Sequence, residues 1–117
     1  MKEKTQLYLV LKKQYFNEIL AGTKTEEYRD FTDFFINKLC NVDDEGEITD
    51  FRKYDTVKFQ MGYNKDAPQM IVECKEIYIA HDEDIPEKDL QPENFFFVIT
   101  LGKILEKINC WICIKVF

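Results

Sequence analysis

Gly22 separates a helical pattern from a strand-like pattern, and this change of period constrains the fold of the chain strongly. In Lys13–Ala21, apolar side chains recur at spacings of one, three and four residues, as on one face of a helix. The members of this face are Tyr15, Phe16, Ile19 and Leu20. A glycine after such a face favours a left-handed turn that ends the helix. We therefore expect a short helix that stops at Gly22 and leads directly into a strand at Lys24–Arg29.

The expected strand after Gly22 is unusually polar. Its period of two places Thr25, Glu27 and Arg29 on one side, and Lys24, Glu26 and Tyr28 on the other. Lysine and arginine contact phosphates, and a glutamate can accept hydrogen bonds from the exocyclic amine of a base. The same residues can instead form an internal Glu27–Arg29 ion pair, which needs no ligand. The residues leave both interpretations open.

Most of the remaining chain has strand-like patterns. Apolar patterns predict strands at Gln6–Leu11, Thr56–Met61, Met70–Ala80, Phe95–Ile108 and Cys110–Phe117. The last two are expected to be broken near Gly102 and Asn109. A second helix is expected from an N-cap at Thr32 through Leu39, with Phe35, Ile36 and Leu39 buried. Asn41–Asp50 and His81–Asn94 read as loops, the second with at most a short helical turn.

These elements predict one α+β domain over residues 1–117, built on a small, closed or nearly closed β-barrel. It would have about six mostly antiparallel strands and two short flanking helices near the N-terminus. Gln6–Leu11 is apolar on both faces, which favours a position inside the fold rather than on its edge. The turn at Gly62–Gln69 joins its two flanking strands as a hairpin.

The formal net charge of −6 is concentrated in Asp43–Asp50 and Asp82–Asp89, which hold five acidic residues each. The rest of the chain carries 12 acidic and 15 basic residues. A locally positive cleft is therefore compatible with the composition, although we do not expect binding to duplex DNA, which needs many phosphate contacts. As an alternative, the acidic loops can recruit a basic protein partner. The oligomeric state stays open.

The cysteines and the apolar runs limit the remaining classes. Cys40 and Cys74 lie in apolar patterns and read as core residues. Cys110 and Cys113 have C-x-x-C spacing, but no second pair accompanies them and His81 is the only histidine. We expect no metal and no cofactor. The N-terminus lacks the apolar stretch of a signal peptide and no apolar run reaches membrane-span length, so we expect a cytoplasmic protein without a membrane partner.

The run Lys12–Arg29 resembles the signature of the ASCH domains, which belong to the PUA-like superfamily. That signature is an aromatic-bearing helix, then Gly-x-Lys-Thr, an apolar, a polar and an apolar residue, and an arginine. Tyr54–Phe59 and Phe96–Ile104 are similar to the second and the late strand of the family, in the same order. The resemblance implies a PUA-like β-barrel flanked by helices, with a cleft lined by Gly22–Arg29.

The resemblance also implies binding of RNA, a nucleotide or a modified nucleoside in this cleft, with Lys24, Thr25, Glu27 and Arg29 as contacts. Exposed tyrosines can stack on a base, and Tyr63, in a polar turn, is the one least needed for packing.

An alternative function is a hydrolase, since some ASCH proteins cleave the acetyl amide of N4-acetylcytidine and others are nucleases. Lys24 would then stabilise charge and Glu27 would act as the base. Those amidohydrolases carry a nucleophilic threonine three residues after the lysine, where this chain has Glu27. The resemblance therefore does not extend to their full catalytic set.

Overall fold

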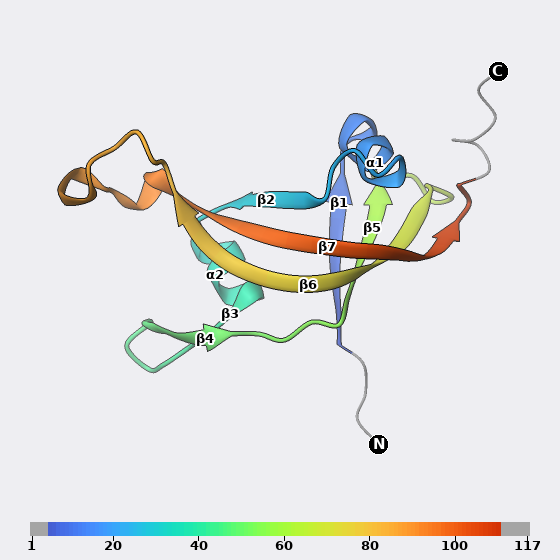
Figure 1. Ribbon diagram of the computed structural model, residues 1–117. Coiled ribbons are helices and arrows are strands. Elements are labelled where there is room, and N and C mark those ends of the chain that lie inside the picture. Colours follow the sequence, from blue (N-terminus) through green and yellow to red (C-terminus); the bar gives the residue numbers. More distant parts are fainter. Residues whose placement is uncertain (1–4, 111–117) are drawn as a thin grey trace. The chain divides into compact units, whose positions relative to one another are not determined.

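The computed structural model describes residues 5–110, which form a mixed α+β fold with two helices and seven strands (Figure 1). The elements are β1 (Gln6–Leu11), α1 (Lys13–Leu20), β2 (Glu26–Asp30), α2 (Asp33–Leu39), β3 (Cys40–Val42), β4 (Ile48–Phe51), β5 (Thr56–Met61), β6 (Gln69–His81) and β7 (Phe95–Ile108). The predicted α+β class and both helices are confirmed. The predicted strand at Cys110–Phe117 lies almost wholly outside the described residues.

Hydrogen bonds connect five strands in the order β1-β5-β6-β7-β2, and β3 pairs with β4 in a separate ribbon. β1 runs parallel to β5, whereas β5 pairs antiparallel with β6 and β2 pairs antiparallel with β7. The predicted hairpin of β5 and β6 is therefore confirmed. The parallel pair makes the sheet mixed.

Residue contacts divide the chain into two compact units. The first unit comprises Met1–Thr25, Tyr54–Lys75 and Leu101–Phe117, and the second comprises Glu26–Lys53 and Glu76–Thr100. The first therefore contains β1, α1 and β5, and the second contains β2, α2, β3 and β4. The long strands β6 and β7 contribute residues to both.

The core of the first unit lies between its strands and α1 (Figure 1). β1 and β5 run side by side, and α1 contacts both of them. The buried side chains include Leu7, Leu9, Leu11, Phe16, Ile19, Val57 and Phe59. Each such side chain contributes roughly 1.5–3 kcal/mol when it leaves water. This burial orients α1 and the residues that flank it.

β1 lies at an end of the strand order, so the prediction of an interior position is wrong. Its odd-numbered leucines are buried, but Tyr8 is 42% exposed and Val10 is half-buried. The Tyr8 hydroxyl donates a hydrogen bond to Gln60 Oε1 (2.5 Å), so this ring lies along the surface of the sheet. An apolar outer face therefore does not require a second covering layer, because tyrosine presents a polar end to water.

Gly22 ends α1 as predicted, with a φ of +83°. Its N–H donates to Ile19 O (3.0 Å), while the Thr23 N–H donates to Glu18 O (3.0 Å). These two bonds form a Schellman motif, which satisfies carbonyls that the helix end leaves without partners. The Lys24 N–H reaches the same Glu18 carbonyl at 3.1 Å. The polar segment after the helix thus begins with a structural cap.

The core of the second unit includes Phe97 of β7, which is completely buried. Thr32 caps α2 as predicted, since its Oγ1 accepts a hydrogen bond from the Phe35 N–H (3.4 Å). Of the expected buried stripe of α2, Leu39 is fully buried, but Phe35 and Ile36 are only half-buried.

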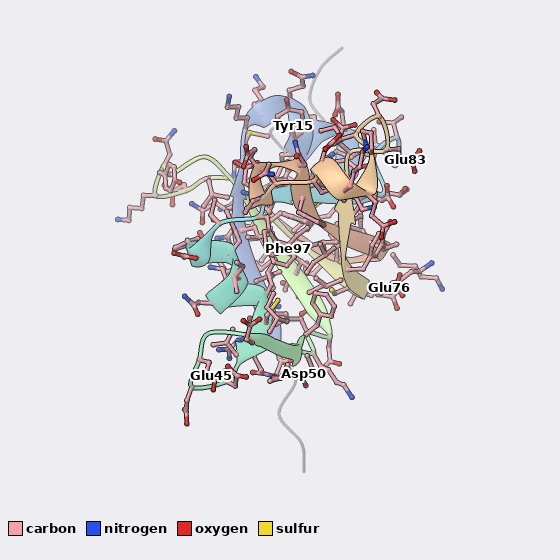
Figure 2. All side chains as sticks on the ribbon, turned by 90° about the vertical axis from the view of Figure 1, so that its left-hand side faces the viewer. Tyr15, Glu45, Asp50, Glu76, Glu83 and Phe97 are labelled. Carbon is pink, nitrogen blue, oxygen red and sulfur yellow. The ribbon has the colours of Figure 1, made fainter. Side chains whose placement is uncertain are left out.

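The segment Asn41–Asp50 was expected to be a loop, but it contains most of a β3–β4 hairpin. Asp43 closes the turn, because its Oδ1 accepts hydrogen bonds from the N–H groups of Glu45 and Glu47, both at 2.9 Å. Figure 2 shows Glu45 and Asp50 projecting away from this hairpin. Its side chains are mostly exposed and polar, so no apolar alternation marks it in the sequence.

Candidate functional site

The predicted strand Lys24–Arg29 divides between the two units. Lys24 and Thr25 belong to the first unit, whereas β2 begins at Glu26 in the second. Thr25 is exposed, and its carbonyl accepts a hydrogen bond from the Leu101 N–H (2.9 Å). Within β2 the predicted alternation is confirmed, since Glu27 is buried and Tyr28 is exposed.

Glu27 and Arg29 form the ion pair that the sequence left open. Arg29 Nη2 lies 2.7 Å from Glu27 Oε2, and the two side chains are 19% and 8% exposed. Glu27 Oε1 accepts a second hydrogen bond from the Tyr28 N–H (3.2 Å). The Arg29 guanidinium stacks over the Phe35 ring at 5.6 Å. The pair therefore joins β2 to α2 within the second unit, because a buried carboxylate needs such partners.

Lys24 has a different environment. Its Nζ lies 5.6 Å from the centroid of the Tyr15 ring, within range of a cation–π interaction. Tyr15, predicted on the apolar face of the helix with Phe16 and Ile19, is 41% exposed, so it does not share their burial. Phe16 takes the core position instead, and Tyr15 points about 100° away from it around the helix axis. Figure 2 shows Tyr15 projecting outward from α1.

Tyr63 lies in the β5–β6 turn and is 87% exposed. The parallel register pairs Leu11 with Met61, and the Gly62 N–H donates to Leu11 O (3.0 Å). The residues that follow the two strands are therefore neighbours, which brings Lys12–Lys13 close to the turn of Tyr63. These two lysines were not predicted as contacts, because nothing in the sequence indicated a parallel pairing of β1 with β5.

Lysines and exposed tyrosine rings therefore occur together in the first unit. We define the basic-aromatic surface as Lys12, Lys13, Tyr15, Lys24 and Tyr63. Lys12, Lys13 and the two tyrosines are exposed, and Lys24 is half-buried. Thr25 adds an exposed hydroxyl beside Lys24 in the chain.

Charge is divided unequally between the units. The residue ranges of the first unit hold 11 basic and 6 acidic residues, a net charge of +5. Those of the second hold 5 basic and 16 acidic residues, a net charge of −11. Both acidic segments noted in the sequence belong to the second unit. Lys24 and Tyr63 therefore lie in a positive unit, whereas Glu27 and Arg29 lie in a negative one.

The cysteines of the described part have structural surroundings. Cys40 is completely buried, as predicted, and Cys74 is half-buried. Burial raises the pKa of both thiols above its usual range, which disfavours the reactive thiolate. The Cys110 thiol donates to Gln69 O (3.1 Å), while Cys113 lies outside the described residues. In residues 5–110, no group of three His, Cys, Asp or Glu side chains could hold a metal ion.

No protein-family model matches the chain, and comparisons with curated proteins and with solved structures also give no match. Among the helices of the described part, none is long and apolar enough to cross a membrane. Function is therefore inferred from geometry and charge.

Proposed function

We propose that the first unit binds single-stranded RNA or a nucleotide through the basic-aromatic surface. The observation that carries this proposal is the placement of three lysines and two exposed tyrosine rings in a unit of net charge +5. Proteins that bind single strands combine a positive surface for the phosphates with rings on which bases stack.

Each residue has a separate role in this proposal. Lys24, held over the Tyr15 ring, contacts a phosphate as a compact point charge. Thr25 donates a hydroxyl hydrogen bond to the same phosphate. Tyr63, with most of its ring in solvent, stacks on a base, which contributes about 1–3 kcal/mol.

This proposal follows the resemblance to the ASCH domains and includes a PUA-like barrel for the whole chain. It assigns Glu27 and Arg29, first considered as ligand contacts, to holding β2 and α2 together. Both oxygens of Glu27 already accept hydrogen bonds, which favours binding over a hydrolase with Glu27 as its base.

The test is a fluorescence-anisotropy titration of the full chain with labelled single-stranded RNAs and with mononucleotides. We expect saturable binding that Tyr63→Leu weakens by about 1–3 kcal/mol. Lys24→Ala should weaken binding and reduce the slope of log K against log salt by roughly 0.7, because one phosphate contact is lost. Lys88→Ala is the matched control, since Lys88 is an exposed lysine of the second unit.

Two results would overturn the proposal. One is the absence of saturable binding across the RNAs and nucleotides. The other is equal affinity of wild type, Lys24→Ala and Tyr63→Leu. Incubation with N4-acetylcytidine tests the hydrolase alternative, for which turnover must be lost in Lys24→Ala.

A further inference from the structure

The second unit has an aromatic face of its own. Tyr28 and Tyr78 are 50% and 37% exposed, and Phe96 is half-buried. The rings of Tyr28 and Phe96 meet edge to face, with centroids 6.0 Å apart and planes at 75°. Tyr28 lies on the opposite side of β2 from Glu27 and Arg29, so this face is separate from their ion pair.

Carboxylates lie beside the exposed rings. The Tyr28 hydroxyl donates to Glu26 Oε1 at 2.7 Å, and this hydrogen bond is the main reason why the pKa of Tyr28 is raised. The pKa of Tyr78 is also raised, first by burial and then by the carboxylates of Glu26 and Glu76. Figure 2 shows Glu76 projecting outward. Two phenol rings therefore share their surroundings with two negative charges.

A pocket of about 460 Å³ shares Phe96 with this face. It lies at the end of β6, where the Asp82 N–H donates to Asn94 O (3.0 Å) and holds the base of the following loop together. Its lining comprises Ala80, His81, Asp82, Glu83, Glu93, Asn94 and Phe96. The pocket thus combines a ring with carboxylates, at a volume in the range of ligand sites, roughly 300–1,000 Å³.

The chemistry of this surface suits a cation. The face of an aromatic ring attracts ammonium and guanidinium groups, and neighbouring carboxylates add a full opposite charge. The net charge of −11 on the second unit draws cationic partners and repels phosphates. The apolar stems of arginine and lysine can lie along the rings of Tyr28 and Phe96.

We propose that the aromatic-acidic surface binds an arginine- or lysine-bearing segment of a protein partner, with one cationic side chain in the pocket beside Phe96. The aromatic-acidic surface is defined as Glu26, Tyr28, Glu76, Tyr78 and Phe96 together with the pocket. This proposal goes beyond RNA binding by the first unit and does not depend on it.

The test is an anisotropy titration of the full chain with a labelled arginine-rich peptide. A peptide with citrulline at every arginine is the neutral control of the same shape, and spermine tests a free polycation. We expect the arginine peptide alone to bind saturably, more weakly as salt rises. Tyr28→Leu should weaken binding about two- to fivefold, because it removes the ring but keeps an apolar side chain. Glu83→Gln and Glu93→Gln should each weaken binding and reduce its salt dependence.

Matched controls come from other parts of the same unit. Phe34→Leu changes an exposed ring of α2, and Glu45→Gln neutralises an exposed carboxylate of the β3–β4 turn. Both should bind the arginine peptide like wild type. Equal binding of the citrulline peptide, or equal effects of control and site variants, would overturn the proposal. Two further results would also overturn it. One is saturable binding of spermine but not of the arginine peptide. The other is binding of single-stranded RNA that Tyr28→Leu weakens.

Discussion

A shift of one residue along a helix or a strand changes the direction of the side chain, so neighbouring residues of this chain have different roles. Phe16 is completely buried while Tyr15 beside it supports Lys24 from the surface. In β2, Glu27 faces the interior and Tyr28 faces solvent. The interior residue is held in an ion pair, and the outer residue lies half in solvent beside Glu26 and Phe96. Substitutions of Glu27 and of Tyr28 should therefore have different effects on the protein.

Arg29→Ala is expected to reduce the free energy of unfolding by about 3 kcal/mol, because it leaves the buried Glu27 carboxylate without its ion-pair partner. Replacement of both residues by methionine should cost less, since no charge then remains buried. Urea denaturation of the two variants and of wild type measures the difference. A loss of stability in the double variant as large as in Arg29→Ala would contradict this account.

Tyr28 is expected to ionise at a higher pH than an ordinary tyrosine, because its hydroxyl donates to the Glu26 carboxylate. Its raised folded-state pKa stabilises the fold fully below about pH 10, the unfolded value, and this stabilisation is lost as pH rises through the folded value. Glu26→Gln should lower the Tyr28 pKa. Absorbance titrations measure the Tyr28 pKa by difference. Wild type is compared with Tyr28→Phe, and Glu26→Gln is compared with the double variant Glu26→Gln/Tyr28→Phe. An unchanged Tyr28 pKa in Glu26→Gln would refute the assignment.

At the scale of elements, strand bounds were more predictable than strand pairing. β1, β5 and β7 begin and end at the predicted residues, because apolar side chains mark them. The break expected near Gly102 is wrong, since β7 continues through this residue. The parallel register of β1 with β5 had no such signal, yet it brings Lys12–Lys13 close to the turn of Tyr63. The β3–β4 hairpin was missed because backbone hydrogen bonds and the Asp43 turn hold it, without an apolar face.

Gly22→Ala is expected to destabilise the protein by about 1–2 kcal/mol, because the left-handed conformation that ends α1 strains a residue with a β-carbon. No heavy atom lies within 4 Å of the added carbon, so the cost is conformational rather than steric. Gly22→Asn should cost less, since asparagine tolerates this conformation better. Thermal unfolding of both variants tests the order, which steric crowding would reverse.

At the scale of the whole molecule, the two units differ in charge, +5 against −11. The net charge of −6 is therefore the sum of a positive unit, whose charge attracts phosphates, and a negative unit, whose charge attracts cations. The single domain predicted over residues 1–117 stays a prediction, as does the PUA-like barrel. The two proposals together assign nucleic acid to one unit and a basic partner to the other.

Single-stranded RNA is expected to bind more tightly than a duplex of the same length. The bases of a duplex are stacked on each other and cannot stack on Tyr63. The duplex presents more phosphate, but the overall charge of −6 of the protein repels this higher negative charge. Competition of unlabelled single strand and duplex against a labelled single strand measures the order. Displacement by the duplex at equal or lower concentration would argue for binding through phosphates alone.

The sequence by itself determined the α+β class, both helices, the Gly22 stop, the Thr32 cap and the concentration of acidic residues. These features depend on neighbours within a few positions along the chain, where period, capping and composition act directly. Only the tertiary structure decided that Glu27 pairs with Arg29, that Tyr15 lies at the surface and that β1 joins β5 in parallel. The β1–β5 pairing joins segments far apart in the chain, and the other two outcomes depend on which side of β2 and of α1 the rest of the fold covers, which local patterns do not encode.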